Sequence, residues 1–197
     1  MKIALILATA LAALAIPLSG QAAPATHQTA NVMAFDEPAF PSLSALVQPQ
    51  YGSATLTRNN NGINFTLHTT GLPAGDAVTI WWVVFDASNT FPIDVSVADG
   101  HVIGGNGVGN FGGYLREGAT PNPAGCFIPG GSLDFPCNGL STDPAVGDSR
   151  TANVWLLVRV HGPARPGDIP AQIHTSELPQ CAPTVCFQVQ GAFFPGV

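Results

Sequence analysis

An apolar stretch near the middle of the chain reads Ala77-Val-Thr-Ile-Trp-Trp-Val-Val-Phe85. It is apolar on both faces and rich in β-branched and aromatic residues, which predicts a central strand of a sheet. Shortly before it, Ile63-Asn-Phe-Thr-Leu-His-Thr69 alternates apolar and polar residues. This alternation predicts a strand with one buried face and places His68 on the wetter face.

Other strand signals surround these two stretches. The sequence Asn59-Asn-Asn-Gly62 separates a short strand at residues 53–58 from the alternating strand, and Asn-Gly is a strong hairpin signal. Further strands are expected at residues 93–97, 101–103, 111–115, 152–160 and 185–193. Short strands at hairpin spacing without a helical period predict an all-β domain over residues 51–197, a single antiparallel immunoglobulin-like β-sandwich.

Composition narrows the function classes. The 197 residues include 22 Gly and 18 Pro, which disfavours long helices. Twelve acidic residues against six basic ones give a formal net charge of -6, which argues against a nucleic-acid partner. Lys2 is the only lysine, so catalysis through a lysine amine is not expected in the mature protein.

The first residues have the pattern of a secretory signal peptide. Met1-Lys2 supplies a positive charge, residues 3–18 are apolar, and small residues precede a cleavage site after Ala22. We therefore expect residues 1–22 to be removed and the mature protein to be secreted or periplasmic, without a transmembrane anchor.

Two irregular segments flank this pattern. Residues 23–50 contain four prolines and predict an extended N-terminal arm that covers part of the domain. Residues 116–150 predict a long loop that holds Cys126 and Cys137. With Cys181 and Cys186 these make four cysteines in an exported chain, which favours two disulfides over a zinc site. Local pairing within each pair is the simplest of three connectivities.

The glycines of Gly107-Val-Gly-Asn-Phe-Gly112 match the dinucleotide-binding fingerprint literally. That fingerprint needs a helix after it, and here strand-like segments flank it on both sides. We interpret the segment as a turn.

Catalytic signals are weak. A G-x-S-x-G nucleophile elbow is absent, and Ser132 is its nearest approach. Asp94, Asp99, Glu117 and Asp134 are candidates for a glycosidase-type pair of carboxyl groups, but acids on loops are usually solvated. The sequence therefore favours a non-enzymatic protein over an enzyme. It assigns no catalytic residue and leaves the cofactor unknown.

Histidines supply an alternative hypothesis. His101 begins a strand-like segment, His161 ends a buried one, and His174 follows a Pro-rich turn. If these strand ends meet, the three imidazoles, or two of them with Asp99, form a metal or acid–base site. No ligand spacing supports this, and the competing interpretation is that they hydrogen-bond to loop backbone.

Trp81 and Trp82 must face opposite sides of a strand, so one fills the core and the other lies outside or under the arm. An exposed tryptophan among Trp81, Trp82 and Trp155 would be required for a carbohydrate-binding role built on such a ring.

Several stretches resemble a group of exported bacterial proteins of unassigned function. They are residues 66–85, Gly100-His-Val-Ile-Gly-Gly-Asn-Gly107, Val158-Arg-Val-His-Gly-Pro163, Gln172 and the closing cysteine segment. The resemblance implies fold and export but no activity. In that group a cysteine follows the Trp-Trp strand, whereas residues 86–91 here contain none.

The leading expectation is an exported, non-catalytic binding or structural protein with an extracellular ligand. Its ligand surface is expected at the Gly-rich turns around residues 104–113, with Trp81, Gly107 and Asn110 as ligand-binding residues. The alternative is a metal-binding protein or metal-dependent enzyme using His101 and His161.

Overall fold

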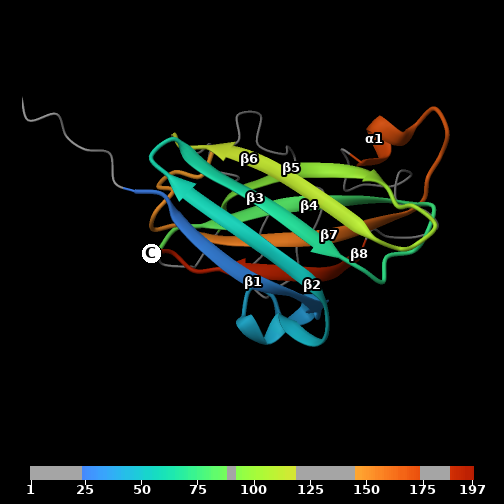
Figure 1. The fold of residues 1–197 in the computed structure, drawn as a ribbon, viewed down its shortest axis with the longest axis horizontal. Coiled ribbons are helices and arrows are strands. Elements are labelled where there is room, and N and C mark those ends of the chain that lie inside the picture. Colours follow the sequence, from blue (N-terminus) through green and yellow to red (C-terminus); the bar gives the residue numbers. More distant parts are fainter. Residues whose placement is uncertain (1–23, 88–91, 119–144, 174–186) are drawn as a thin grey trace, which may run out of the picture.

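The computed structural model describes residues 24–87, 92–118, 145–173 and 187–197, and it confirms an all-β protein. Eight strands form one antiparallel sheet in the order β5-β4-β7-β8-β1-β2-β3-β6 (Figure 1). Their bounds are β1 Thr26–Phe35, β2 Leu46–Asn59, β3 Gly62–Thr69, β4 Asp76–Phe85, β5 Pro92–Val102, β6 Gly109–Arg116, β7 Asn153–Pro163 and β8 Phe187–Phe194. The described helices are η1 (Glu37–Ala39), η2 (Leu43–Ala45) and α1 (Ile169–Ile173). None of these helices has the length and apolar character needed to cross a membrane.

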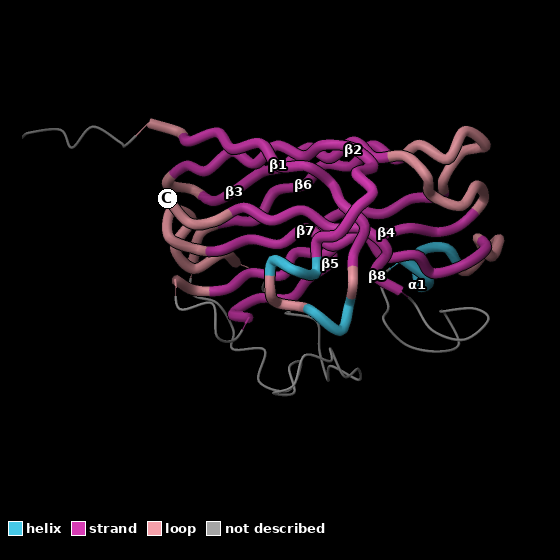
Figure 2. The backbone as a smooth tube through the Cα atoms, turned by 90° about the horizontal axis from the view of Figure 1, so that it is seen from below, coloured by secondary structure: helices cyan, strands magenta, loops and turns pink. Residues whose placement is uncertain are grey.

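The sheet bends back until its two edge strands, β5 and β6, approach one another. The Gly112 amide donates to Asp99 Oδ2 at 2.9 Å, and the rings of His101 and Phe111 stack with centroids 4.4 Å apart. At Gly113, a Cβ would lie only 3.1 Å from the Ala98 carbonyl oxygen, so the close approach favours glycine there. The sheet is thus nearly closed, and its halves β5-β4-β7-β8 and β1-β2-β3-β6 face each other (Figure 2).

Apolar side chains from both halves fill the space between them. We call this cluster the inner core. Trp82 of β4 packs edge-on against Phe65 of β3, with ring centroids 4.9 Å apart. The other fully buried members include Leu56, Ile63, Ile80, Leu156 and Phe194. Burial of these side chains is the main stabilising contribution of the fold.

A second apolar cluster lies on the opposite face of β4 and β7, and we call it the outer cluster. It contains Trp81, Val83 and Phe85 of β4 with Trp155 and Leu157 of β7. The segment of residues 36–45, which carries η1 and η2, covers it with Phe40 and Ala45. The Phe40 ring meets the Trp155 ring edge-on at 5.2 Å. Figure 2 shows this segment beneath the half of the sheet that contains β4 and β7.

These contacts confirm several sequence predictions. β4 lies between β5 and β7 inside the sheet, and Trp81 and Trp82 point to opposite faces. β2 and β3 form the expected hairpin, in which Asn59 pairs with Gly62. Gly107, at φ 69°, belongs to the turn before β6 rather than to a strand–helix junction.

The N-terminal segment differs from the expected arm. Residues 26–35 form β1, which pairs with β2 along its length and with β8 at Met33 and Ala34. β2 itself begins at Leu46, before the expected boundary at residue 51. Only the part between β1 and β2 behaves as the covering segment, because it buries Phe40 against the outer cluster.

The guanidinium group of Arg58 joins four parts of the chain at one end of the sheet. It is fully buried, and its five N–H groups have acceptors on Gln28 of β1, on the loop that precedes β7 and on the residues that end and follow β8. The contacts run from Nε to Gln28 Oε1 (2.6 Å), from one terminal nitrogen to the Ser149 and Ala152 carbonyls (both 2.9 Å), and from the other to the Phe194 and Pro195 carbonyls (3.2 and 2.9 Å). Burial and the neighbouring Arg150 lower the pKa of Arg58 to about 10, so it stays charged at neutral pH.

We expect Arg58→Met to lower the free energy of unfolding by about 3–5 kcal/mol, because it leaves several buried acceptors without a donor. Urea unfolding of the full chain measures this loss. Arg165→Met is the matched control, since its 3.5 Å ion pair with Asp168 lies near the surface and contributes at most about 1 kcal/mol. Equal stability of the two variants would contradict the role given to Arg58.

Candidate functional site

The outer faces of β1, β2, β3 and β6 carry polar side chains and lack a covering layer of described residues. Strand alternation produces this arrangement, because every second residue of these strands points into the inner core. The intervening residues point outward, and three from each strand lie side by side in one patch. They are His27, Thr29 and Asn31 of β1; Ser53, Thr55 and Thr57 of β2; Asn64, Thr66 and His68 of β3; and Asn110, Gly112 and Tyr114 of β6. We call these residues the polar face.

Strand register aligns the polar face in rows that cross the four strands. The first row is His27, Thr57, Asn64 and Tyr114, because each residue pairs with the next across neighbouring strands. The middle row is Thr29, Thr55, Thr66 and Gly112, and the third row is Asn31, Ser53, His68 and Asn110. Since neighbouring strands lie about 4.8 Å apart, the side chains form a regular lattice.

Hydrogen bonds between neighbouring strands orient several of these groups. Thr55 Oγ1 lies 2.8 Å from Thr66 Oγ1 in the middle row. His27 Nδ1 lies 3.0 Å from Thr57 Oγ1, and His68 Nδ1 lies 2.8 Å from Asn110 Oδ1. Hydroxyl, amide and imidazole groups of this kind retain further donor or acceptor capacity toward a ligand.

The polar face contains no Asp, Glu, Lys or Arg, although the chain carries a formal net charge of -6. Two charged groups border it: Arg116 is the outward residue after Tyr114 on β6, and the Asp99 carboxylate of β5 accepts from the Gly112 amide at 2.9 Å. Anionic or cationic ligands are normally held by opposite charges or metals. The chemistry of this face therefore suits an uncharged ligand that both donates and accepts hydrogen bonds.

Tyr114 provides an exposed aromatic ring at the edge of the polar face. The side chain is 56% exposed, and its hydroxyl donates to the Asn61 carbonyl at 2.6 Å. Asn61 belongs to the β2–β3 turn, so the ring is held at a fixed point beside the first row. On the same face of β6 the preceding position is Gly112, whose lack of a side chain leaves space beside the ring.

The expected ligand residues lie in different places. Asn110 is on the polar face and is exposed, and Gly107 lies in the turn that leads into its strand. Trp81 is only 3% exposed and packs in the outer cluster, so the structure does not bring it together with Asn110. Trp82 and Trp155 are also buried, and a carbohydrate site on any of the three tryptophans lacks its exposed ring.

The structure does not bring His101 and His161 together. His101 pairs with Val78, whose side chain is in the inner core, and stacks on Phe111. His161 approaches Thr79, the next residue along β4, and so lies on the opposite face of the sheet. His174 is outside the described residues. Within the described part of the chain, no group of three His, Cys, Asp or Glu side chains is placed to hold a metal ion.

His161 belongs to a buried hydrogen-bond chain. Trp81 Nε1 donates to Thr79 Oγ1 at 2.8 Å, and the same oxygen lies 2.8 Å from His161 Nε2. Arg159, on the same strand as His161, places its guanidinium carbon 5.4 Å from the centroid of the Trp81 ring. Burial, and then the positive charge of Arg159, lower the pKa of His161 to about 3, so its imidazole is neutral at physiological pH.

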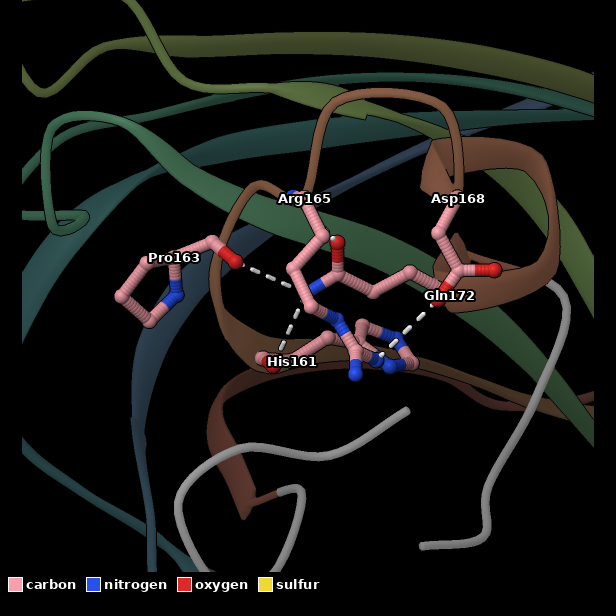
Figure 3. Close-up of polar contacts among 5 residues, drawn as sticks. All are labelled: His161, Pro163, Arg165, Asp168 and Gln172. Carbon is pink, nitrogen blue, oxygen red and sulfur yellow. Dashed lines mark hydrogen bonds and ion pairs between the residues drawn. The ribbon is translucent and has the colours of Figure 1, made fainter. Parts of the chain in front are cut away.

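The loop after β7 is fixed by the buried amide of Gln172 in α1 (Figure 3). Its Nε2 donates to the carbonyls of His161 (3.2 Å) and Pro163 (3.0 Å), and its Oε1 accepts from the Arg165 amide at 3.1 Å. Gln172 therefore has a structural role. Its hydrogen bonds hold the loop against the end of β7, where His161 lies.

Sequence reasoning missed most of the polar face. The alternation in residues 63–69 correctly exposed His68, but nothing local indicated that Tyr114 and Thr57 would be brought into one row. The four cysteines, Cys126, Cys137, Cys181 and Cys186, lie outside the described residues, so the expected disulfides stay a prediction.

Comparison of the chain with protein-family models, curated proteins and solved structures gives no match.

The buried His161 predicts a specific dependence of stability on pH. The unfolded chain binds a proton on this histidine near pH 6.5, whereas the folded chain binds it only near pH 3. The free energy of unfolding therefore falls as the pH drops through this interval, by up to about 1.4 kcal/mol per pH unit. We expect His161→Gln to flatten the curve between pH 6.5 and 4.5, as measured by urea unfolding. Parallel wild-type and variant curves would contradict this assignment.

Proposed function

We propose that the protein is an exported, non-catalytic binding protein and that its polar face binds an uncharged carbohydrate. The observation that carries the proposal is a lattice of hydroxyl, amide and imidazole groups over four strands, without a formal charge. An uncharged polyhydroxylated ligand matches this surface because its hydroxyl groups both donate and accept hydrogen bonds.

Rigidity of the surface supports binding. The groups stand on the interior strands β1, β2 and β3 and on β6, whose opposite faces are packed in the inner core. A surface fixed in this way loses little conformational freedom when a ligand binds, which favours affinity.

The residue content of the polar face supports binding without hydrolysis. Glycoside hydrolysis ordinarily requires a pair of carboxyl groups on either side of the scissile bond. The outward positions of β1, β2, β3 and β6 that form the face supply none. A ligand held there would be retained unchanged.

Export and the finer fold class belong to the same proposal. The signal-like residues 1–22, four cysteines suited to an oxidising compartment and the resemblance to exported bacterial proteins all support secretion or a periplasmic location. We also infer that the two halves of the sheet act as the layers of the expected immunoglobulin-like sandwich, with the cysteines paired as disulfides.

Retention on insoluble polysaccharides tests the proposal. We expect the purified protein to be retained on at least one of cellulose, xylan, chitin and starch at physiological salt. Thr55→Arg places a long charged side chain at the centre of the polar face and should reduce the affinity at least about tenfold.

Ala171→Arg is the matched control, because it makes the same change of charge at an exposed position of α1. Thermal unfolding of both variants verifies that they are folded. Absence of retention on all four polysaccharides, or equal retention of the two folded variants, would overturn the proposal.

A further inference from the structure

We propose that the ligand is an extended neutral oligosaccharide chain that lies across the strands along the first row, with one sugar ring stacked on Tyr114. This inference rests on the proposed function and adds the direction of the chain and the residue that anchors it.

Tyr114 has the geometry of a stacking platform. Its hydroxyl is fixed on the Asn61 carbonyl at 2.6 Å, while more than half of the side chain is exposed to solvent. The ring therefore presents an apolar surface without needing to be ordered on binding. Aromatic side chains with one polar tether and one apolar surface suit the C–H faces of pyranose rings.

The row that begins at Tyr114 continues with groups suited to sugar hydroxyls. Asn64 lies directly opposite Tyr114, Thr57 opposite Asn64, and His27 opposite Thr57. Four side chains on four strands span about 14 Å, because neighbouring strands are about 4.8 Å apart. A row of this length matches an extended chain of a few pyranose rings rather than a single sugar.

The alternative direction, along β6, is less favourable. From Tyr114 the next outward position on that strand is Gly112, which has no side chain with which to bind a second sugar. The middle row ends at Gly112, and the third row ends at Asn110, so the polar face has its aromatic ring in the first row. Gly112 instead leaves room for the sugar that covers the Tyr114 ring.

Isothermal titration with cellohexaose, xylohexaose, maltohexaose and hexa-N-acetylchitohexaose, each beside its disaccharide, tests the anchor. For the hexasaccharide that binds wild type most tightly, we expect Tyr114→Ala to weaken binding about tenfold or more and Tyr114→Trp to retain it. Tyr114→Phe keeps the ring but loses the bond to Asn61, so its affinity should fall less than that of Tyr114→Ala.

The direction of the chain is tested with two histidines of the polar face. His27 lies at the far end of the first row, and His68 lies in the third row. We expect His27→Ala to weaken hexasaccharide binding more than His68→Ala does, and the wild type to bind hexasaccharides more tightly than disaccharides. Matching melting temperatures verify that the variants are folded.

The outcomes separate the two proposals. If polysaccharides are retained and Thr55→Arg abolishes retention, but Tyr114→Ala binds as wild type or His68→Ala is the more damaging change, the first-row inference fails and the proposed function stands. If wild type binds neither polysaccharides nor hexasaccharides, both fail.

Discussion

The structure depends on one constraint, which is that β4 and β7 are apolar on both faces and must be covered on both. On one side the sheet covers them itself, by bending until β1, β2, β3 and β6 pack across the inner core. On the other side the segment of residues 36–45 packs Phe40 against Phe85 and Trp155. Both covering elements are used to bury β4 and β7, and the outer face of β1-β2-β3-β6 stays exposed. Its polar composition follows, because an exposed apolar sheet face would promote association.

A few side-chain hydrogen bonds fix which segments of the chain lie together, which hydrophobic burial alone does not determine. Hydrophobic burial is not directional, whereas hydrogen bonds specify which segments meet. Arg58 joins β2 to β1, to the loop before β7 and to the C-terminal residues, and Asp99 links the edge strands through the Gly112 amide. Gln172 does the same for the loop after β7. The register of the rows on the polar face is therefore a property of the whole fold, and a ligand meets groups that are already in place.

The sequence predicted those strands whose pattern of apolar and polar residues is visible within the strand itself. The two-sided apolar run of β4, the alternation in β3 and the Asn-Gly turn were readable because each reflects the burial of neighbouring positions along one strand. β1 was not predicted, because its inward residues include Gln28 and Ala30 and prolines follow it closely.

The candidate site was less predictable from the sequence than the strands were. Strand register is decided by pairing between segments that are far apart in sequence. Local patterns therefore did not indicate that Tyr114 and His27 would share a row, or that His101 and His161 would lie on opposite faces of the sheet.

The central claim is that the polar face, and no other surface of the described chain, contacts a neutral carbohydrate. The most direct test is an amide NMR titration of the labelled full chain with cellohexaose, xylohexaose, maltohexaose and hexa-N-acetylchitohexaose. The account predicts that shift changes concentrate in β1, β2, β3 and β6, and that they are largest around Asn64 and Tyr114. Changes centred on Trp81 and His161, or no changes with any of the four sugars, would contradict it.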